Sequence, residues 1–433
     1  MYGLNIRMSS SQDMVRPGEP LDLYYYSGET SKKSAFATTQ NTKYQVNFNN
    51  TGAGTSSFLF PPQCGLQDIV VTMQFAGIPN TFSGLTGLAL PAGWGYGLIK
   101  SCAFRYGGTS QFVLSGDQLL QNALRDQTSR TSCDDIVNIG GNYASGVDLT
   151  NTQTASIVLR LPHASCSGVN KSLPFPTDCL TQQCQVLLEL NAPATVWTNV
   201  SGLALPSQCL QLSQGYFQCQ QIMFNNMGDS LARRVDLSSK AYAFPCEFVQ
   251  QKSVINLVNS TAPQPVVLTG FRAGSVKSIQ IWCSDLADTQ TNSSSGSSTG
   301  FNPNKLQVPV SVECVYAGDI YARYNNGVGQ LFNLINSNKA SAFDLALVAV
   351  GAGTSVDPPL PYLSQWLELP FAQPLCDEDS HYILMHGKNI TNGIINLNNL
   401  VLPYASPVGW QLNISYVYTT TLLFSQGSCD YVF

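Results

Sequence analysis

For most of its length the chain consists of short apolar or alternating runs separated by turn residues. The strongest run is Leu66–Phe75, with the sequence LQDIVVTMQF, which is rich in Val and Ile and is followed by glycine and proline. Ile157–Leu161, Gln185–Leu190 and Val276–Trp282 are similar. From Tyr44 onward the pattern therefore predicts an all-β chain of many short strands.

Two segments depart from this pattern and predict short helices. Ser115 stands before the apolar residues Leu119 and Leu120, and Gln118 follows it by three positions. A serine with glutamine three residues later is the signature of a capped helix start. The second helix candidate is Gly327–Ser337.

The stretch Ile99–Ala123 has a second copy 212 positions later, in which Cys102 corresponds to Cys314 and Gln118 to Gln330. Other matches follow in the same order along the chain. They are 66–72 with 276–282 at an offset of 210, Leu173-Pro174-Phe175 with Leu369-Pro370-Phe371 and 186–189 with 382–385 at 196, and Leu205-Pro206 with Leu402-Pro403. Because the order is preserved, we interpret the chain as an internal duplication that forms two successive β-sandwiches.

A polar break at residues 225–245 separates the two halves. Residues 1–45 are polar and show no sustained period, as is typical of an extended arm. We therefore expect an N-terminal arm over 1–45, a first β domain over 46–235 and a second over 236–433. The Ser/Gly/Asn-rich run 288–304 is expected to be a surface loop.

Charged residues make up only 11% of the chain, against about 25% in typical soluble domains. Two interpretations stay open: a surface covered by neighbours in an assembly, or an uncharged polar surface like that of some secreted β proteins. The net charge of −5 argues against direct binding of nucleic acid, which needs a basic face. The chain shows neither an apolar run long enough to span a membrane nor a signal-peptide core, which indicates synthesis in the cytosol.

The residue types that carry chemistry are sparse. The 13 cysteines include no C-x-x-C pair, so a reduced and largely buried set is expected and zinc is disfavoured. His163 and His381 lie in polar connections, and His381 follows an acidic run that we interpret as an exposed loop. We therefore expect no catalytic residue, no cofactor site and no metal site.

The tryptophans and the carboxylates in predicted strands suggest two other kinds of site. The five tryptophans could line a carbohydrate groove, but their scatter favours packing in cores or interfaces. A glycoside hydrolase would need paired carboxylates on facing strands. Glu189 and Asp68 lie in predicted strands, but the sequence does not pair them.

The stretch FRYGGTSQFVLSGDQLL, from Phe104 to Leu120, resembles the strand–Gly-Gly–helix segment of a known capsid protein family. The pattern of Leu173-Pro174-Phe175 and Leu205-Pro206 is similar to the later part of the same domain. The family is the double jelly-roll major capsid proteins of tailless icosahedral double-stranded DNA viruses of the PRD1–adenovirus type, which include those of large eukaryotic DNA viruses, virophages and polinton-like viruses. The resemblance covers about residues 45–433.

This resemblance implies two tandem eight-stranded jelly rolls with short helices in the connecting loops. It implies a structural capsid protein without enzymatic activity, present in the virion after synthesis in the host cytoplasm. It also implies a homotrimer with a pseudo-hexagonal base, which contacts neighbouring capsomers and, through the N-terminal arm, minor capsid or penton proteins and an inner membrane. The alternative from another functional class is a lectin-like protein that binds carbohydrate or a receptor.

Overall fold

A computed structural model describes the following parts of the 433-residue chain. They are residues 37–46, 54–59, 65–76, 93–106, 109–125, 130–141, 153–159, 175–177, 180–191, 197–198, 212–224, 242–286, 299–300, 307–325, 367–371, 388–390 and 394–432.

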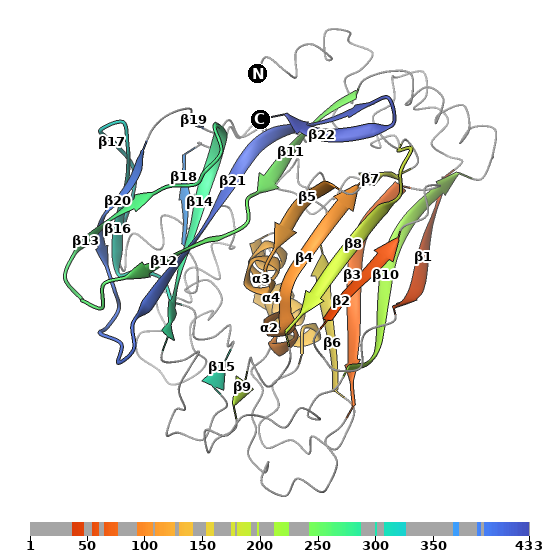
Figure 1. Cartoon of the computed structure of the whole chain (residues 1–433), viewed down its shortest axis with the longest axis horizontal. Helices are drawn as coiled ribbons and strands as arrows, with labels where there is room; N and C mark the ends of the chain where they lie inside the picture. Colours follow the sequence, from red (N-terminus) through yellow and green to blue (C-terminus); the bar gives the residue numbers. More distant parts are fainter. Residues whose placement is uncertain are drawn as a thin grey trace, which may run out of the picture.

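The first half of the chain forms two antiparallel sheets that lie against each other (Figure 1). One has the strand order β1-β10-β3-β6, with the short β7 beside β3, and the other has the order β2-β8-β4-β5. The strands are β1 Ala37–Val46, β2 Gly54–Leu59, β3 Gly65–Phe75, β4 Ile99–Tyr106, β5 Thr109–Leu114, β6 Gln153–Leu159, β7 Phe175–Pro176, β8 Cys184–Leu190 and β10 Leu212–Phe224.

Three short helices accompany the first half. They are α2 Trp94–Leu98, α3 Gly116–Arg125 and α4 Arg130–Ile139. All three contact β6, and in Figure 1 they lie on the side of the first half that faces the second. No helix in the described part of the chain is both long and apolar enough to cross a membrane.

The second half repeats the arrangement. One sheet has the order β11-β21-β14-β18, with β12, β19 and β22 attached to it, and the other has the order β13-β20-β16-β17. The strands are β11 Tyr242–Val249, β12 Ser253–Leu257, β13 Gln264–Leu268, β14 Gly274–Asp285, β16 Ser311–Tyr316, β17 Asp319–Asn325, β18 Leu367–Pro370, β19 Lys388–Ile390, β20 Ile395–Val401, β21 Trp410–Ser425 and β22 Ser428–Val432. A two-stranded bridge of β9 Trp197–Thr198 and β15 Thr299–Gly300 joins the halves.

Both halves are eight-stranded jelly rolls. If β11 and β12 are counted as one strand, because they pair in succession with β21, each half has eight principal strands. In each half, strands one, eight, three and six form one sheet, and strands two, seven, four and five form the other. This order is that of a jelly roll. The predicted fold, two tandem jelly rolls with short helices, is confirmed.

The strand registers fix the repeat more exactly than the sequence match does. A bulge in the β4–β5 pairing lies between Phe104 and Arg105, and the β16–β17 pairing has its bulge between Cys314 and Val315. The structural offset in these hairpins is therefore 210 rather than the predicted 212. It equals the offset predicted for 66–72 and 276–282, where β3 and β14 occupy the same position in their sheets.

Two later sequence matches are wrong. Leu369 pairs with Ile279 in the way that Leu159 pairs with Ile69, so β18 corresponds to β6 and not to the segment 173–175. The counterpart of β8 is β20, because each lies between the second and fourth strands of its roll. The other half of that match, 382–385, lies outside the described residues, as do Leu205-Pro206, Gly327–Ser337 and most of 288–304.

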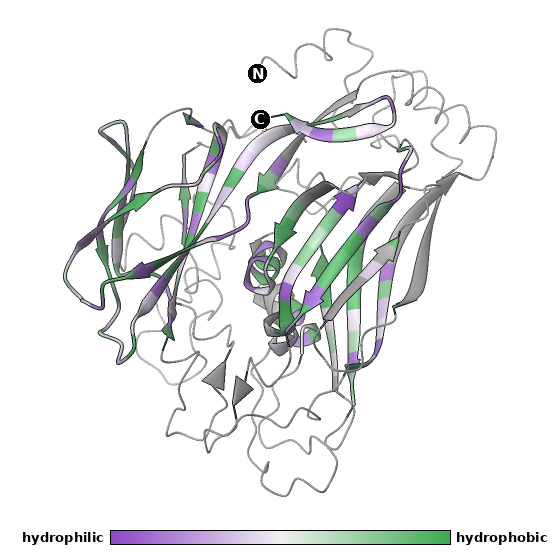
Figure 2. Ribbon diagram, in the orientation of Figure 1, coloured by the Kyte–Doolittle hydropathy of each residue, from purple (hydrophilic) through white to green (hydrophobic). Residues whose placement is uncertain are grey.

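The cores follow from strand alternation. On β3, Ile69, Val71, Met73 and Phe75 are buried, and the residues between them are half-buried. Figure 2 shows the same alternation of hydrophobic and hydrophilic residues along several strands. Because successive strand residues point to opposite faces, one face of each sheet fills the core and the other is available for contacts.

The predicted arm is too long at its C-terminal end. β1 begins at Ala37 and pairs with β10 from Ala37↔Phe224 to Val46↔Gly215, so residues 37–45 belong to the first sheet. The first 36 residues lie outside the described part of the chain. The division between the two β domains, predicted after residue 235, stays a prediction.

Candidate functional site: the contact between the jelly rolls

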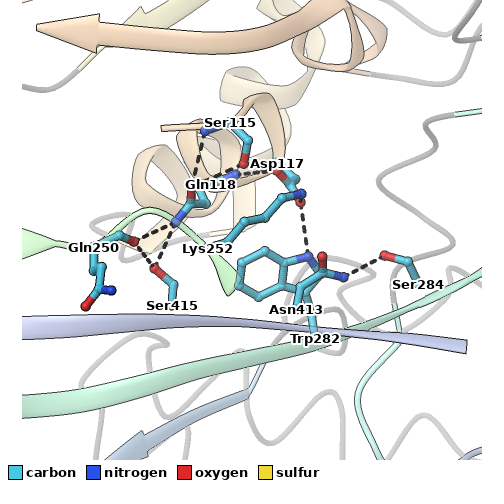
Figure 3. A network of polar contacts seen from close by, with 9 residues as sticks. All are labelled: Ser115, Asp117, Gln118, Gln250, Lys252, Trp282, Ser284, Asn413 and Ser415. Carbon is cyan, nitrogen blue, oxygen red and sulfur yellow. Dashed lines mark hydrogen bonds and ion pairs between the residues drawn. The ribbon is translucent and has the colours of Figure 1, made fainter. Parts of the chain in front are cut away.

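Side chains that are far apart in the sequence converge where α3 of the first roll meets the sheet of β14 and β21 in the second (Figure 3). Within the described ranges there is no cluster of three or more His, Cys, Asp or Glu that could hold a metal ion. The polar network at this contact, which connects side chains of both halves, is the candidate functional site.

The start of α3 supplies the side chains from the first roll. The Ser115 amide donates a hydrogen bond to Gln118 Oε1 at 3.2 Å, which forms one half of the predicted capping box and confirms the helix start. Ser115 Oγ donates to Asp117 Oδ1. This arrangement leaves the Gln118 amide nitrogen free to reach the second roll.

Asp117 is the centre of the network. Its Oδ2 accepts hydrogen bonds from Lys252 Nζ at 2.6 Å and from Trp282 Nε1 at 3.2 Å. Its Oδ1 accepts a hydrogen bond from the backbone N–H of Gln118 at 3.1 Å. Burial favours a raised pKa for this carboxyl, but the Lys252 charge and the hydrogen bonds from Lys252, Ser115 and Gln118 together lower the pKa below its ordinary value. Asp117 is therefore an ionised, fully partnered carboxylate.

Lys252 reaches Asp117 because of an irregularity in the second roll. β11 pairs with β21 down to Val249↔Val417, and β12 resumes at Ser253↔Ile414. Three residues, 250–252, therefore face two on β21, which is the pattern of a bulge. Such a bulge changes the direction of backbone and side-chain groups, and here the Gln250 carbonyl and the Lys252 side chain contact α3.

Gln118 forms the second crossing. Its Nε2 donates to the Gln250 carbonyl at 3.0 Å and to Ser415 Oγ at 2.8 Å, and Ser415 Oγ donates in turn to the Gln250 carbonyl at 2.8 Å. Ser415 has no exposed surface, and Trp282 has none either. The Gln118 and Ser415 side chains, which are 1% and 0% exposed, are therefore buried polar groups with hydrogen-bond partners.

A second contact lies at the turn between β21 and β22. Gln426 and Gly427 both have positive φ, 50° and 75°, which is typical of a tight hairpin turn. The Gly427 carbonyl accepts hydrogen bonds from the Thr181 amide at 2.9 Å, from Thr181 Oγ1 at 3.1 Å and from the Tyr106 hydroxyl, all in the first roll. The end of the second roll is thereby fixed to the end of the first.

These contacts hold two domains in one relative position. The network consists of a mostly buried ion pair, neutral hydrogen bonds and one indole ring, and Asp117 stays ionised at neutral pH. Satisfied buried networks of this kind specify geometry more than they add stability. The arrangement is that of a structural joint.

The sequence-predicted candidates lie elsewhere. Glu189 is on β8 and is paired with Lys100 at 2.6 Å and Ser101 at 3.0 Å; the hydrogen bonds from these two residues lower its pKa. Asp68 is on β3, but its side chain is outside the described part, and so are His163 and His381. The structure does not bring these residues into one described site.

The tryptophans and cysteines behave as predicted wherever their side chains are described. Trp94, Trp282 and Trp410 are at most 1% exposed, so they pack in cores and at the joint instead of lining a carbohydrate groove. The described cysteines are free and buried, and burial raises the thiol pKa to about 12 in all but Cys184, for which only burial is described. They are Cys102, Cys184, Cys283, Cys314 and Cys429.

Sequence reasoning found Ser115 and Gln118 as a helix cap but missed Asp117, Lys252 and Trp282 as partners. Asp117 and Lys252 are 135 residues apart. The signal in the sequence that points to Trp282 is the offset of 210, which aligns Trp282 with Thr72. An indole at a position that is polar in the first copy indicates that this face of the second copy is covered.

No profile of a known protein family matches the chain, and no curated protein sequence matches it. Several solved structures are similar to it. The VP54 protein of the virus PBCV-1, fitted into a reconstruction of the virophage Sputnik, is 13% identical with a TM-score of 0.61, and the match covers 92% of this chain and 97% of VP54. A chain of a PBCV-1 capsid model has 13% identity, a TM-score of 0.60 and the same coverage.

A chain from the Sputnik virophage structure has 11% identity and a TM-score of 0.53, and the match covers 91% of this chain and 88% of that one. These likenesses extend over both jelly rolls. They show that the chain has the double jelly-roll fold of viral capsid proteins.

Proposed function

We propose that the chain is the major structural capsid protein of an icosahedral double-stranded DNA virus. One observation carries the proposal: both jelly rolls have the same strand order and are fixed together by a polar joint, in a fold shared with PBCV-1 VP54 over 92% of the chain. A rigid pair of similar domains suits a shell, because it offers near-sixfold packing from threefold symmetry.

In this function the protein forms homotrimers with a pseudo-hexagonal base, and these capsomers tile the virion shell. Its partners are neighbouring capsomers, together with minor capsid or penton proteins and an inner membrane contacted through the N-terminal arm. The subunit is made in the host cytoplasm, has no enzymatic activity and needs no cofactor. It makes no direct contact with nucleic acid, in keeping with its net charge of −5.

The low charge supports this function over the lectin-like alternative. Only 11% of the residues are charged, and large subunit interfaces exclude charge. The described tryptophan side chains are buried and so are not available to stack on a sugar.

Size-exclusion chromatography with light scattering, followed by electron microscopy of negatively stained particles, tests the proposal. We expect a trimer of about three subunit masses with a pseudo-hexagonal outline. A chain that stays monomeric at micromolar concentration, with no higher assembly at any ionic strength, would contradict the proposed function.

A further inference from the structure

The helix α3 carries a polar stripe toward the second roll, where it lies over β14 and β21 (Figure 3). Asp117 and Gln118 make the direct contacts described above. Gln121 follows Asp117 by four residues and Gln118 by three. At about 100° per residue, its side chain leaves the helix in a direction between those two. Gln121 therefore belongs to the face of α3 that meets the second roll.

On the sheet side, Gln280 of β14 lies beside both points that α3 touches. It pairs directly with Ser415 of β21, which accepts the hydrogen bond from Gln118. It also precedes Trp282 by two residues, and residues two apart in a strand share one face of the sheet. Gln280 is therefore placed between the Ser415 contact and the contact of the Trp282 indole with α3.

These two glutamines are buried with unused hydrogen-bonding groups. Gln121 is 2% exposed and Gln280 is 1% exposed. In the described part of the chain, neither Nε2 nor Oε1 of Gln121 has a hydrogen-bond partner, and Nε2 of Gln280 has none. Buried amide groups rarely stay without partners, because folding removes the water that they bind in the unfolded chain. The centre of the joint is therefore built to hold something that these amides can bind.

The three atoms define the chemistry of that ligand. The two Nε2 groups need an acceptor, which excludes a metal cation as their partner. Gln121 Oε1 needs a donor, which a simple anion does not have, and the ionised Asp117 on the same helix face repels an anion. A small neutral molecule that both accepts and donates hydrogen bonds meets all three needs. Water is the molecule of this kind that proteins bury, typically with about three hydrogen bonds.

We propose that the joint encloses a binding site for ordered water between Gln121 of the first roll and Gln280 of the second. The water oxygen accepts an N–H from each of the two side chains, and Gln121 Oε1 accepts a hydrogen from this water or from a second one. The two rolls are thus linked through water beside their direct contacts at Asp117 and Gln118. This inference does not depend on the proposed function.

A crystal structure of the full chain, at a resolution that shows ordered water, tests the site directly. We expect a water within hydrogen-bonding distance of both Gln121 and Gln280 Nε2. The contact of Gln118 Nε2 with Ser415 Oγ, at 2.8 Å, is an internal control and should have no water between its two atoms. Amides that bond directly to each other or to other protein groups, with no water between the rolls, would overturn the inference.

A double-mutant cycle in the full chain tests the bridge in solution. Gln121→Leu and Gln280→Leu each remove one amide and keep most of the side-chain volume. We expect each single variant to lower the folded-to-unfolded ratio about 10-fold, because the water and the remaining amide lose a partner. The double variant should lose about as much as one single variant, since the bridge is already broken. If the amides are dry, each leucine removes an orphaned polar group and raises stability. A rise in stability, or two additive losses, would overturn the inference.

The control is Gln183→Leu, which removes the same amide at an exposed position next to β8. It should stay within about threefold of the parent chain. Urea unfolding at one protein concentration measures all variants, and circular dichroism of each checks that the fold is retained. Where a leucine variant does not fold, the presence or absence of the water in the parent structure decides the inference.

Discussion

The two jelly rolls share their strand order but differ in the pairing of the first strand with the eighth. In the first roll, β1 pairs with β10 without interruption over ten residues, and the neighbouring sheet face is open. In the second roll, the break between β11 and β12 brings the Gln250 carbonyl and the Lys252 side chain to α3, and the face is covered. The second roll therefore differs from the first by one extra residue within 250–252 and by the indole of Trp282, and both belong to its contact with α3.

The difference shows how a duplicated domain specialises. The face of β14 and β21 that packs against α3 forms its contact within a single chain, so it can use a buried ion pair and Trp282. On the matching face of β3 in the first roll, the outward residues Val70, Thr72 and Gln74 are half-buried. The variants below test this difference in burial between the two rolls through the unfolding free energy that each variant loses.

The largest effect is expected when the same new residue is placed at equivalent positions in the two rolls. Ser415 and Gln218 are equivalent, because Ser415 pairs with Gln280 as Gln218 pairs with Val70. Ser415 has no exposed surface, whereas Gln218 is exposed. Ser415→Lys buries an unpaired charge in a filled space and should cost about 3–5 kcal/mol in unfolding free energy. Gln218→Lys should cost less than about 0.5 kcal/mol in the dilute subunit.

Urea unfolding of both variants, followed by circular dichroism, gives the two free energies. Equal losses in the two variants would mean that the joint is not buried in solution, and the contrast between the faces would fail.

The next effect concerns the ion pair. Asp117→Asn removes the carboxylate charge but keeps the shape of the side chain. Lys252, whose side chain is only 25% exposed, then has a neutral and weaker partner. We expect a loss of about 2 kcal/mol. A double-mutant cycle with Lys252→Met isolates the pair and should give a coupling free energy of about 1–2 kcal/mol. Strict additivity of the two single losses would show that the ion pair adds nothing to the joint.

The pH dependence follows from the same carboxyl. Because the pKa of Asp117 in the folded chain is lowered from its ordinary value of 3.8, the ionised form stabilises the folded state above that value. This contribution is lost as the pH falls below 3.8 toward the folded pKa. The parent chain should therefore lose more stability than Asp117→Asn between pH 5 and pH 3. Unfolding free energies of both proteins at each pH measure this, and a constant gap between them would refute the assignment.

The sequence predicted what depends on local pattern and on repeated order. The alternation in 66–72 and 276–282 persists because both strands bury one face, and this match has the correct offset of 210. The Ser115–Gln118 cap was predictable because both partners lie within one helical turn. The Leu-Pro-Phe match failed because three common residues carry no register, and strand pairing places Leu369 opposite Ile279.

The joint itself could not be predicted in the same way. Lys252 reaches Asp117 only because β11 and β12 are interrupted at 250–252, and a bulge of one residue has no fixed sequence signature. Gln118 is a cap in the sequence, but its second role depends on Ser415, 297 residues away. Long-range polar contacts depend on tertiary packing, which local patterns do not encode.

The smallest effect compares the end turns of two hairpins of the second roll. Gly427 has a φ of 75°, and a Cβ there would lie 2.4 Å from Thr181 Cγ2 in the first roll; Gly318 has a φ of 90° and no atom within 4 Å of such a Cβ. Both substitutions to Ala incur the strain of positive φ, about 1 kcal/mol. Gly427→Ala should cost about 1 kcal/mol more, because its methyl group displaces Thr181 from the turn. Thermal unfolding of both variants gives this difference, which reports the docking of the second roll on the first; identical losses would indicate that the turn does not contact Thr181 in solution.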